Sequence, residues 1–400
     1  MSYDVQAVRD RFPSLASGTA HFDGPGGSQV PAAVADAVRD VMTSSISNRG
    51  SVTAAERAAD DVVRAARRAM ADLLAADPSG IVFGRSATAL TYEFARALAR
   101  TWQPGDEVVV SRLDHDANIR PWLQAAEQVG AVARWAEFDP ATGELTPDDV
   151  AAVLSERTRL VAVTGASNLI GTRPPLAAIA RLVHERGALF FVDGVHLTAH
   201  SAVDVAELGA DFFVCSPYKF FGPHCGVLAA DPGLLATLHP DKLLPSSDAV
   251  PERFELGTLP YELLAGTTAA VDFIADLAGG TGDRRARIVA SWQVAGAHED
   301  RLRDVAEAGL RELPGVVVRS RAGSRTPTLL VTFADRDPAD AYRFLAGEGV
   351  NAPAGSFYAL EASRHLGLGD AGGLRIGLAL YTTDAEVDRL LTALGRFLGS

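Results

Sequence analysis

Cysteine is scarce in this chain, since Cys215 and Cys225 are the only two among 400 residues. Two cysteines make neither the disulfide framework of a small secreted protein nor a zinc cluster. We therefore predict a protein of the reducing cytoplasm without a metal site.

Long apolar runs are also missing. No uninterrupted apolar stretch approaches the roughly 18 residues that a membrane-spanning helix needs, and residues 1–10 contain no apolar segment of the secretory type. Positive charge is in deficit as well, because 37 Lys and Arg stand against 50 Asp and Glu, a net charge of −13. Binding to phosphate backbones or anionic lipids needs clustered basic residues. These absences argue against a membrane protein and against a nucleic-acid-binding protein.

What the chain does contain, over its first 280 residues, is an alternation of short apolar runs and helical stretches. The runs cover 81–83, 107–110, 160–163, 188–192 and 211–215, and the helical stretches cover 89–102, 122–129 and 176–186. Near-continuous apolar runs of this length suit strands that are buried on both faces. Helices between such strands imply right-handed crossovers. The pattern therefore predicts an α/β fold with a mainly parallel sheet.

The pattern changes from about residue 281. We expect a long charged helix over 283–313, strands over 315–319 and 328–333, and helices over 339–348 and 384–398. Strands next to helices in a smaller block are typical of an α+β domain. The sequence thus predicts a large domain over 1–285, including an N-terminal segment, and a small C-terminal domain over 286–400.

Polar side chains follow the predicted strands. His115, Asn168, Asp193 and the segment Ser216–Lys219 each come after an apolar run. Because ligands in open parallel sheets gather at the carboxyl ends of the strands, we expect these groups to converge on one edge. Such a set suits pyridoxal phosphate (PLP): a lysine forms the Schiff base, an acid keeps the ring nitrogen protonated, a flat side chain covers the ring, and hydroxyl and N–H groups hold the phosphate.

The segments around these residues resemble the class V aminotransferase family of fold-type I PLP enzymes and are most similar to the cysteine desulfurase-like proteins in it. The matching segments follow the family's order along the chain: 114–118, 167–172, 192–196, 216–223, 254–258 and 374–381. The resemblance implies a seven-stranded, mainly parallel sheet flanked by helices, with a smaller C-terminal α+β domain. It also implies PLP as cofactor, an amino acid as small-molecule substrate, and a homodimer with shared active sites.

The resemblance assigns catalytic roles to three residues. Lys219 forms the Schiff base, and its amine must be neutral to attack the cofactor aldehyde. Asp193 pairs with the pyridine nitrogen, and His115 stacks on the ring and is a candidate proton carrier. Outside such motifs these residues would be a surface lysine, a helix-capping or loop aspartate and a loop histidine.

Further residues are assigned to the cofactor by the same resemblance. Asn168 and His196 belong near the ring oxygen, where desulfurases usually carry glutamine in place of His196 and kynureninase-like or epimerase-like members carry histidine. The phosphate contacts are Ala87, Thr88, Ser216 and, from the second subunit, Thr258. For Thr88, simple capping of a helix is nearly as good an interpretation.

The substrate contacts carried over are Arg375, Arg49 and Tyr358. Arg375 would clamp the α-carboxylate, since a guanidinium matches a carboxylate with two parallel hydrogen bonds. Arg49 resembles an arginine that reaches into the partner's site. Tyr358 stands where desulfurases carry their nucleophilic cysteine, and we expect it to be a substrate-facing acid or a wall of the pocket.

That substitution separates this chain from the desulfurases, because a phenol cannot replace a thiolate in persulfide chemistry. Cys225 is the nearest thiol in the sequence, and we expect a small buried residue there. The leading hypothesis is a PLP-dependent lyase acting on C–S or C–Se bonds without the usual persulfide cysteine. The alternatives are a class V aminotransferase or epimerase and, as a non-enzyme, a PLP-fold binding protein. A dinucleotide-binding dehydrogenase lacks its main signal, since no G-x-G-x-x-G follows the first strands.

Overall fold

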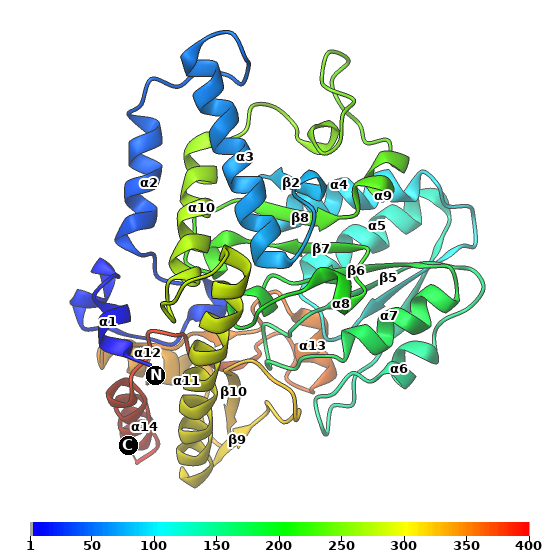
Figure 1. The fold of residues 1–400 in the computed structure, drawn as a ribbon. Coiled ribbons are helices and arrows are strands. Elements are labelled where there is room, and N and C mark those ends of the chain that lie inside the picture. Colours follow the sequence, from blue (N-terminus) through cyan, green and yellow to red (C-terminus); the bar gives the residue numbers. More distant parts are fainter. Residues whose placement is uncertain (1–2, 400) are drawn as a thin grey trace.

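A computed structural model describes residues 3–399, and a seven-stranded sheet forms its larger part (Figure 1). The strands lie in the order β2-β8-β7-β6-β5-β3-β4. Their bounds are β2 Ile81–Gly84, β3 Glu107–Ser111, β4 Val132–Ala136, β5 Thr158–Thr164, β6 Leu189–Asp193, β7 Phe212–Cys215 and β8 Gly226–Ala230. Strand β8 runs antiparallel to β2 and β7, and the other pairs are parallel. The predicted α/β fold with a mainly parallel sheet is confirmed.

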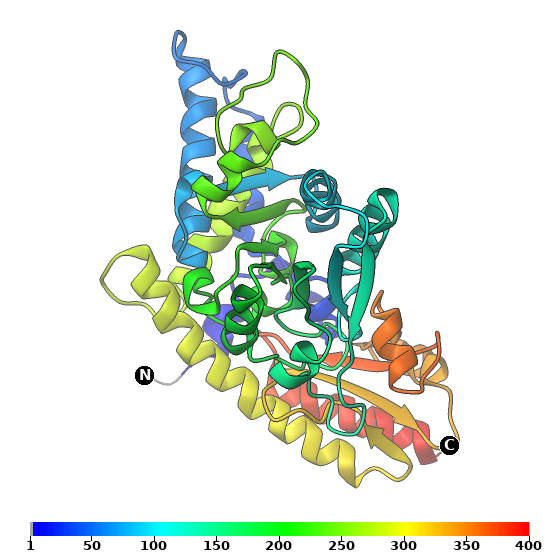
Figure 2. The ribbon, with the colours of Figure 1, turned by 90° about the vertical axis from the view of Figure 1, so that its right-hand side faces the viewer.

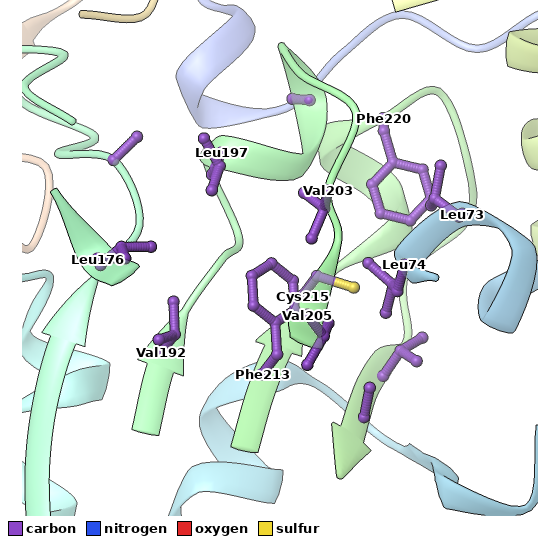
Figure 3. Packing of buried hydrophobic residues seen from close by; sticks show 14 of the residues in the cluster. Leu73, Leu74, Leu176, Val192, Leu197, Val203, Val205, Phe213, Cys215 and Phe220 are labelled. Atoms are coloured by element: carbon purple, nitrogen blue, oxygen red, sulfur yellow. The ribbon is translucent and has the colours of Figure 1, made fainter. Parts of the chain in front are cut away.

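Both faces of this sheet are buried. Phe190 and Val192 of β6 belong to the core on one face and Phe191 to the core on the other, because successive side chains of a strand point to opposite faces. Figure 3 shows part of the first core, which includes Val192, Phe213, Leu74 and Leu176. The apolar runs of the sequence reflect this two-sided burial.

Helices cover the two faces of the sheet. One core includes side chains of α4 (Ala87–Ala99) and α5 (Arg120–Val129), and the other includes side chains of α3 (Ala54–Leu74), α7 (Leu176–Glu185) and α10 (Tyr261–Ala275). The remaining helices before residue 280 are α1 Val5–Arg9, α2 Ala32–Met42, α6 Pro147–Ala151, α8 Val205–Leu208 and α9 Pro232–Thr237, with the short 3-10 turns η1 Pro13–Ser17, η2 Gly24–Gly26, η3 Pro78–Gly80, η4 Asp116–Asn118, η5 Leu197–Ala199, η6 Pro217–Lys219 and η7 Glu252–Phe254. Within residues 3–399, no helix combines the length and the apolar character needed to cross a bilayer.

The C-terminal part contains a second, antiparallel sheet in the order β12-β13-β10-β9. Its strands are β9 Val316–Val318, β10 Thr328–Phe333, β12 Ala354–Gly355 and β13 Gly373–Gly377, and its helices are α11 Arg284–Glu312, α12 Pro338–Gly347, α13 Leu360–His365 and α14 Asp384–Gly399. Figure 2 shows α11, in yellow, running from beside the large sheet toward α14 in red. The expected domain boundary at 285 falls in the first turn of α11 and stays a prediction.

The start of the chain packs on this C-terminal part. Strand β1 (Ala20–His21) pairs in parallel with β11 (Val350–Asn351), and Phe22 joins the C-terminal core. The turn η2 follows directly, so the N-terminal segment reaches the region between the two sheets. This placement brings Pro25 to the candidate site.

Candidate active site

A cavity of about 800 Å³ lies at the carboxyl ends of the parallel strands. Its lining includes ten of the residues singled out from the sequence: Ala87, Thr88, His115, Asn168, Asp193, His196, Ser216, Lys219, Tyr358 and Arg375. The large sheet and α4 supply one wall, and the C-terminal part supplies Arg375 from β13 and a loop before α13. The convergence expected at this edge is therefore present.

Lys219 lies at the end of η6, four residues after β7. Its Nζ donates a hydrogen bond of 2.5 Å to the carbonyl of Pro25 and lies 4.8 Å from the centre of the Tyr218 ring. Burial, followed by the positive charge of Arg375, lowers the pKa of Lys219 to about 7, although Asp193 acts in the opposite direction. A substantial fraction of the amine is therefore neutral at neutral pH, as an attack on an aldehyde requires.

Asp193 is the last residue of β6 and is buried. One carboxylate oxygen accepts a hydrogen bond of 2.9 Å from the backbone N–H of Val195. Burial raises the pKa of Asp193 to about 6, against the opposing effects of this hydrogen bond and of Lys219. A buried carboxylate of this kind gains from a cationic partner, which a protonated pyridine nitrogen would supply.

His115 presents a neutral ring to the cavity. Its Nδ1 accepts a hydrogen bond of 3.0 Å from the N–H of Ala117, so the proton of the neutral ring sits on Nε2. Burial first, then the charges of Lys219 and Arg375, lowers its pKa to about 4. The ring lies 5.5 Å, centre to centre, from that of Tyr358 at an angle of 33°.

Among the cavity-lining side chains within residues 3–399, His196 and Asn168 each have a buried polar atom without a hydrogen-bond partner. The Nε2 atom of His196 lies 3.0 Å from Oγ1 of Thr326 and 2.9 Å from Oγ1 of Thr328, whereas its Nδ1 has no hydrogen-bond partner. Asn168 donates from Nδ2 to the carbonyl of Phe357 at 2.9 Å, and its Oδ1 is unpartnered. Since buried polar groups are nearly always hydrogen-bonded, these atoms indicate a ligand position.

The N-terminus of α4 forms one end of the cavity. The side chain of Ser86 caps the helix by accepting a hydrogen bond of 3.1 Å from the N–H of Ala89, so the cap is Ser86 and not Thr88. A helix start with backbone N–H groups facing a cavity is a favourable site for a phosphate. Gly226 packs against this turn, where a Cβ atom would lie 2.3 Å from the carbonyl carbon of Ser86.

Arg375 is 2% exposed and has no carboxylate ion pair within residues 3–399. Its Nη1 donates to the carbonyl of Asn168 at 3.0 Å, and its Nε is buried without a partner. Its guanidinium carbon lies 3.6 Å from the centre of the Phe357 ring. Burial lowers the pKa of Arg375 to about 9, with Asp23 opposing. A buried cation that forms no ion pair at contact distance is costly, so the arrangement favours an anionic ligand.

Arg49 and Thr258 are not part of this cavity. Arg49 pairs with Asp60 at 2.9 Å and with Glu252 at 3.3 Å within the same chain, and Thr258 is exposed on a loop. Both were assigned to the site of a neighbouring subunit, and that assignment stays a prediction.

Sequence reasoning missed several lining residues. Pro25 and Gly26 come from the far N-terminal segment, and Phe357 precedes the predicted Tyr358 in a loop where the two residues adopt left-handed backbone conformations with φ of 53° and 58°. The glycines of 24–27 were an available signal for a close backbone approach. Nothing in the sequence marks a left-handed phenylalanine and tyrosine, since such residues rarely adopt that conformation.

The match to known proteins is extensive. The family described as aminotransferase class-V matches residues 20–390. The chain belongs to this family. Its sequence is 38% identical over 98% of its length to uncharacterized protein MT3887 of Mycobacterium tuberculosis, covering 99% of that protein. It is 32% identical over 98% of its length to a cysteine desulfurase of Dickeya dadantii, covering 97% of that protein.

The fold is also similar to that of a cysteine desulfurase of known structure. The structure of the cysteine desulfurase CsdA (S-sulfonic acid) from Escherichia coli superimposes with a TM-score of 0.87 and 28% identity, covering 100% of this chain and 99% of that one. The family is PLP-dependent. The residues of this cavity fit that cofactor, because they combine a buried lysine of lowered pKa, a buried acid, a helix N-terminus and the unpartnered polar atoms of His196 and Asn168.

Proposed function

We propose that this protein is a PLP-dependent enzyme that acts on an amino acid and breaks a C–S or C–Se bond without a persulfide cysteine. The observation that carries the proposal is that one cavity contains a buried lysine, the buried Asp193 and a buried arginine without a carboxylate ion pair among residues 3–399. When bound, PLP supplies an aldehyde for the lysine amine and a ring that withdraws electrons from the bonds at the substrate Cα.

Different residues of the cavity would contact different parts of the cofactor. Lys219 would hold the aldehyde carbon, Asp193 the ring nitrogen, and His115 one face of the ring. His196 and Asn168, with their unpartnered atoms, would take the ring oxygen, whereas Ser216 and the start of α4 at Ala87 and Thr88 would take the phosphate.

The substrate would be held by its carboxylate and would exchange protons with Lys219. Since the amine has a pKa of about 7, Lys219 can take a proton at neutral pH and return it. His115 keeps its proton on Nε2, and the Tyr358 ring stands beside it at the mouth of the cavity, 76% exposed. This position supports a role for Tyr358 as a wall of the substrate site.

A thiolate nucleophile is absent from the lining, within residues 3–399. Cys215 and Cys225 are buried and do not line the cavity, and burial raises the pKa of the Cys225 thiol to about 11. A protonated buried thiol is unreactive. Sulfur or selenium would therefore have to leave without being attacked by a cysteine of this chain.

We further infer that the enzyme is a homodimer. The loop that carries Thr258 leaves Leu256 exposed, and the preceding segment exposes Leu243 and Leu244. Exposed apolar side chains in neighbouring segments are typical of a surface covered by another chain, and a second copy would also bring Thr258 to the partner's cavity. Sedimentation of the holoenzyme should give a dimer, and a monomer at micromolar concentration would contradict this.

Product analysis tests the reaction. Cysteine sulfinate is the sharpest substrate, because its sulfur can leave as SO₂ while a proton replaces it at Cβ, so alanine forms without any sulfur acceptor. Cysteine and selenocysteine are assayed with added dithiothreitol as acceptor. We expect alanine from at least one of the three. The absence from all three of both alanine and pyruvate with released sulfide, sulfite or selenide would reject the lyase, and a keto acid that keeps its sulfur or selenium, or solvent deuterium at Cα, would identify an aminotransferase or an epimerase.

A further inference from the structure

Three residues of the cavity hold one another in a closed ring of contacts. The guanidinium of Arg375 stacks on the Phe357 ring at 3.6 Å, and its Nη1 donates to the carbonyl of Asn168 at 3.0 Å. The Asn168 side chain in turn donates to the carbonyl of Phe357 at 2.9 Å. Each member therefore limits the orientation of the next.

The closed set of contacts among Arg375, Asn168 and Phe357 leaves one edge of the guanidinium free. One face is covered by Phe357 and Nη1 is occupied, whereas Nε is buried without a partner. Beside Nη2, the chain has Gly26, at which a Cβ atom would lie 3.4 Å from that nitrogen. The edge formed by Nε and Nη2 can therefore receive the two oxygens of a carboxylate side-on.

Phe357 occupies this position at a conformational cost. Its φ of 53° and the φ of 58° at Tyr358 lie in the left-handed region, which non-glycine residues rarely adopt. Both carbonyls accept hydrogen bonds across the cavity, that of Tyr358 from the N–H of Asp116 at 2.7 Å and that of Phe357 from Nδ2 of Asn168 at 2.9 Å. The loop is thus kept in the conformation that puts the ring against Arg375.

We propose that Phe357 is a positioning residue for the substrate carboxylate, which it serves by holding the Nε–Nη2 edge of Arg375 toward the substrate. The proposal rests on the proposed function, since it assumes that an amino acid binds beside PLP. An aromatic face is suited to this task because it attracts a guanidinium without using any of its hydrogen-bond donors. The substrate class that follows is amino acids with a free α-carboxylate, to the exclusion of their esters and amides.

Two reagents test the proposal without knowledge of the substrate. Aminooxyacetate and O-methylhydroxylamine both react through an aminooxy group with the aldehyde of bound PLP, but only the first carries a carboxylate. The ratio of their rate constants, followed by the loss of the visible band of the holoenzyme, therefore measures carboxylate recognition.

We expect Phe357→Leu to lower the aminooxyacetate rate constant roughly tenfold and to leave that of O-methylhydroxylamine within about twofold. Phe357→Tyr should keep most of the ratio, because it keeps the aromatic face. Gly26→Ala should lower the same ratio by crowding Nη2, which gives a second test should the leucine variant fold poorly. Trp135→Leu is the matched control, since that ring lies 4.8 Å from the Arg112 guanidinium outside the cavity.

The possible results distinguish a failure of the role of Phe357 from a failure of the proposed function. An equal change for both reagents, or an unchanged ratio in Phe357→Leu and Gly26→Ala, would overturn the role of Phe357 while leaving the proposed function intact. A wild-type protein that forms no visible band with PLP would overturn the proposed function and this inference with it.

Discussion

On one side of the cavity the functional side chains follow directly from buried parallel strands, whereas on the other they come from a loop with two left-handed residues. The strand side carries Lys219, Asp193 and His115, the residue types that the resemblance to the PLP enzymes required. The loop side carries Phe357 and Tyr358 and no cysteine among the described residues. One side therefore fits the cofactor of the family, and at the other side we propose that the protein differs from the desulfurases.

The two sides also differ in how their geometry is determined. A strand end is held by the hydrogen bonds of the sheet and by cores on both faces, so its last side chain has little freedom. The loop is held by single contacts, such as the hydrogen bond from Asn168 to Phe357. We infer that the sheet edge keeps the cofactor chemistry constant and that the loop selects the substrate and the bond that breaks.

The largest effect is expected at the strand side. Lys219→Ala removes the amine that holds the cofactor and exchanges protons, and we expect turnover to fall by at least about 10³-fold. The sequence offers a matched control, because Lys242 is the only other lysine in the chain and pairs with Asp248 outside the cavity. Lys242→Ala should retain full turnover in the same assay, and equal losses in both variants would refute the assignment.

A smaller loss is expected at Arg375, where the two sides meet. Arg375→Lys keeps a positive charge but loses the planar fork and the stack on Phe357, so kcat/KM should fall by about 10²-fold. Uptake of PLP should be unchanged, because the cofactor contacts belong to the other side. A lysine variant with wild-type kcat/KM would show that the carboxylate binds elsewhere.

Tyr358→Phe separates the two roles proposed for the tyrosine. If Tyr358 is a wall of the site, removal of its hydroxyl should change KM by less than about fivefold and leave kcat unaltered. A fall in kcat of about 10²-fold or more would instead make the phenol a proton donor. Steady-state kinetics with the substrate found by product analysis decide between these results.

The smallest effect is expected on stability and concerns Asp114, the residue before His115 on the strand side of the cavity. Asp114 is buried, accepts hydrogen bonds from Ser111 and, at 2.7 Å, from Asn118, and burial raises its pKa to about 8. In the unfolded chain this carboxyl group loses its proton near pH 4. Between about pH 4 and pH 8 the folded state therefore binds more protons than the unfolded state, and the stability of the protein falls as the pH rises through this range.

We expect the free energy of unfolding to drop by roughly 1–2 kcal/mol between pH 6 and pH 8, and by less in Asp114→Asn, whose amide is neutral throughout. Urea titrations at the two pH values measure this drop. Asp61→Asn, at an exposed position of α3, is the control and should keep the wild-type drop. A wild-type drop in Asp114→Asn would mean that Asp114 is ionised in the folded protein.

The same contrast explains what the sequence could and could not predict. The strands of the large sheet and the residues at their ends, such as Asp193, follow from apolar runs and from the rule that ligands gather at carboxyl ends. The contact of Lys219 with Pro25 could not be predicted, because it joins residues 194 positions apart through an N-terminal segment that packs on the C-terminal part. The conformation of Phe357 arises from contacts across the cavity and leaves no local pattern.

The most direct test of the account is to find where the cofactor attaches. Holoenzyme prepared with PLP is reduced with borohydride, digested and analysed by mass spectrometry, which locates a reduced pyridoxyl group on either of the two lysines. The account predicts the group on Lys219 in the wild type and in Lys242→Ala, and its loss in Lys219→Ala. A group found on Lys242, or an unmodified chain after reduction, would contradict it.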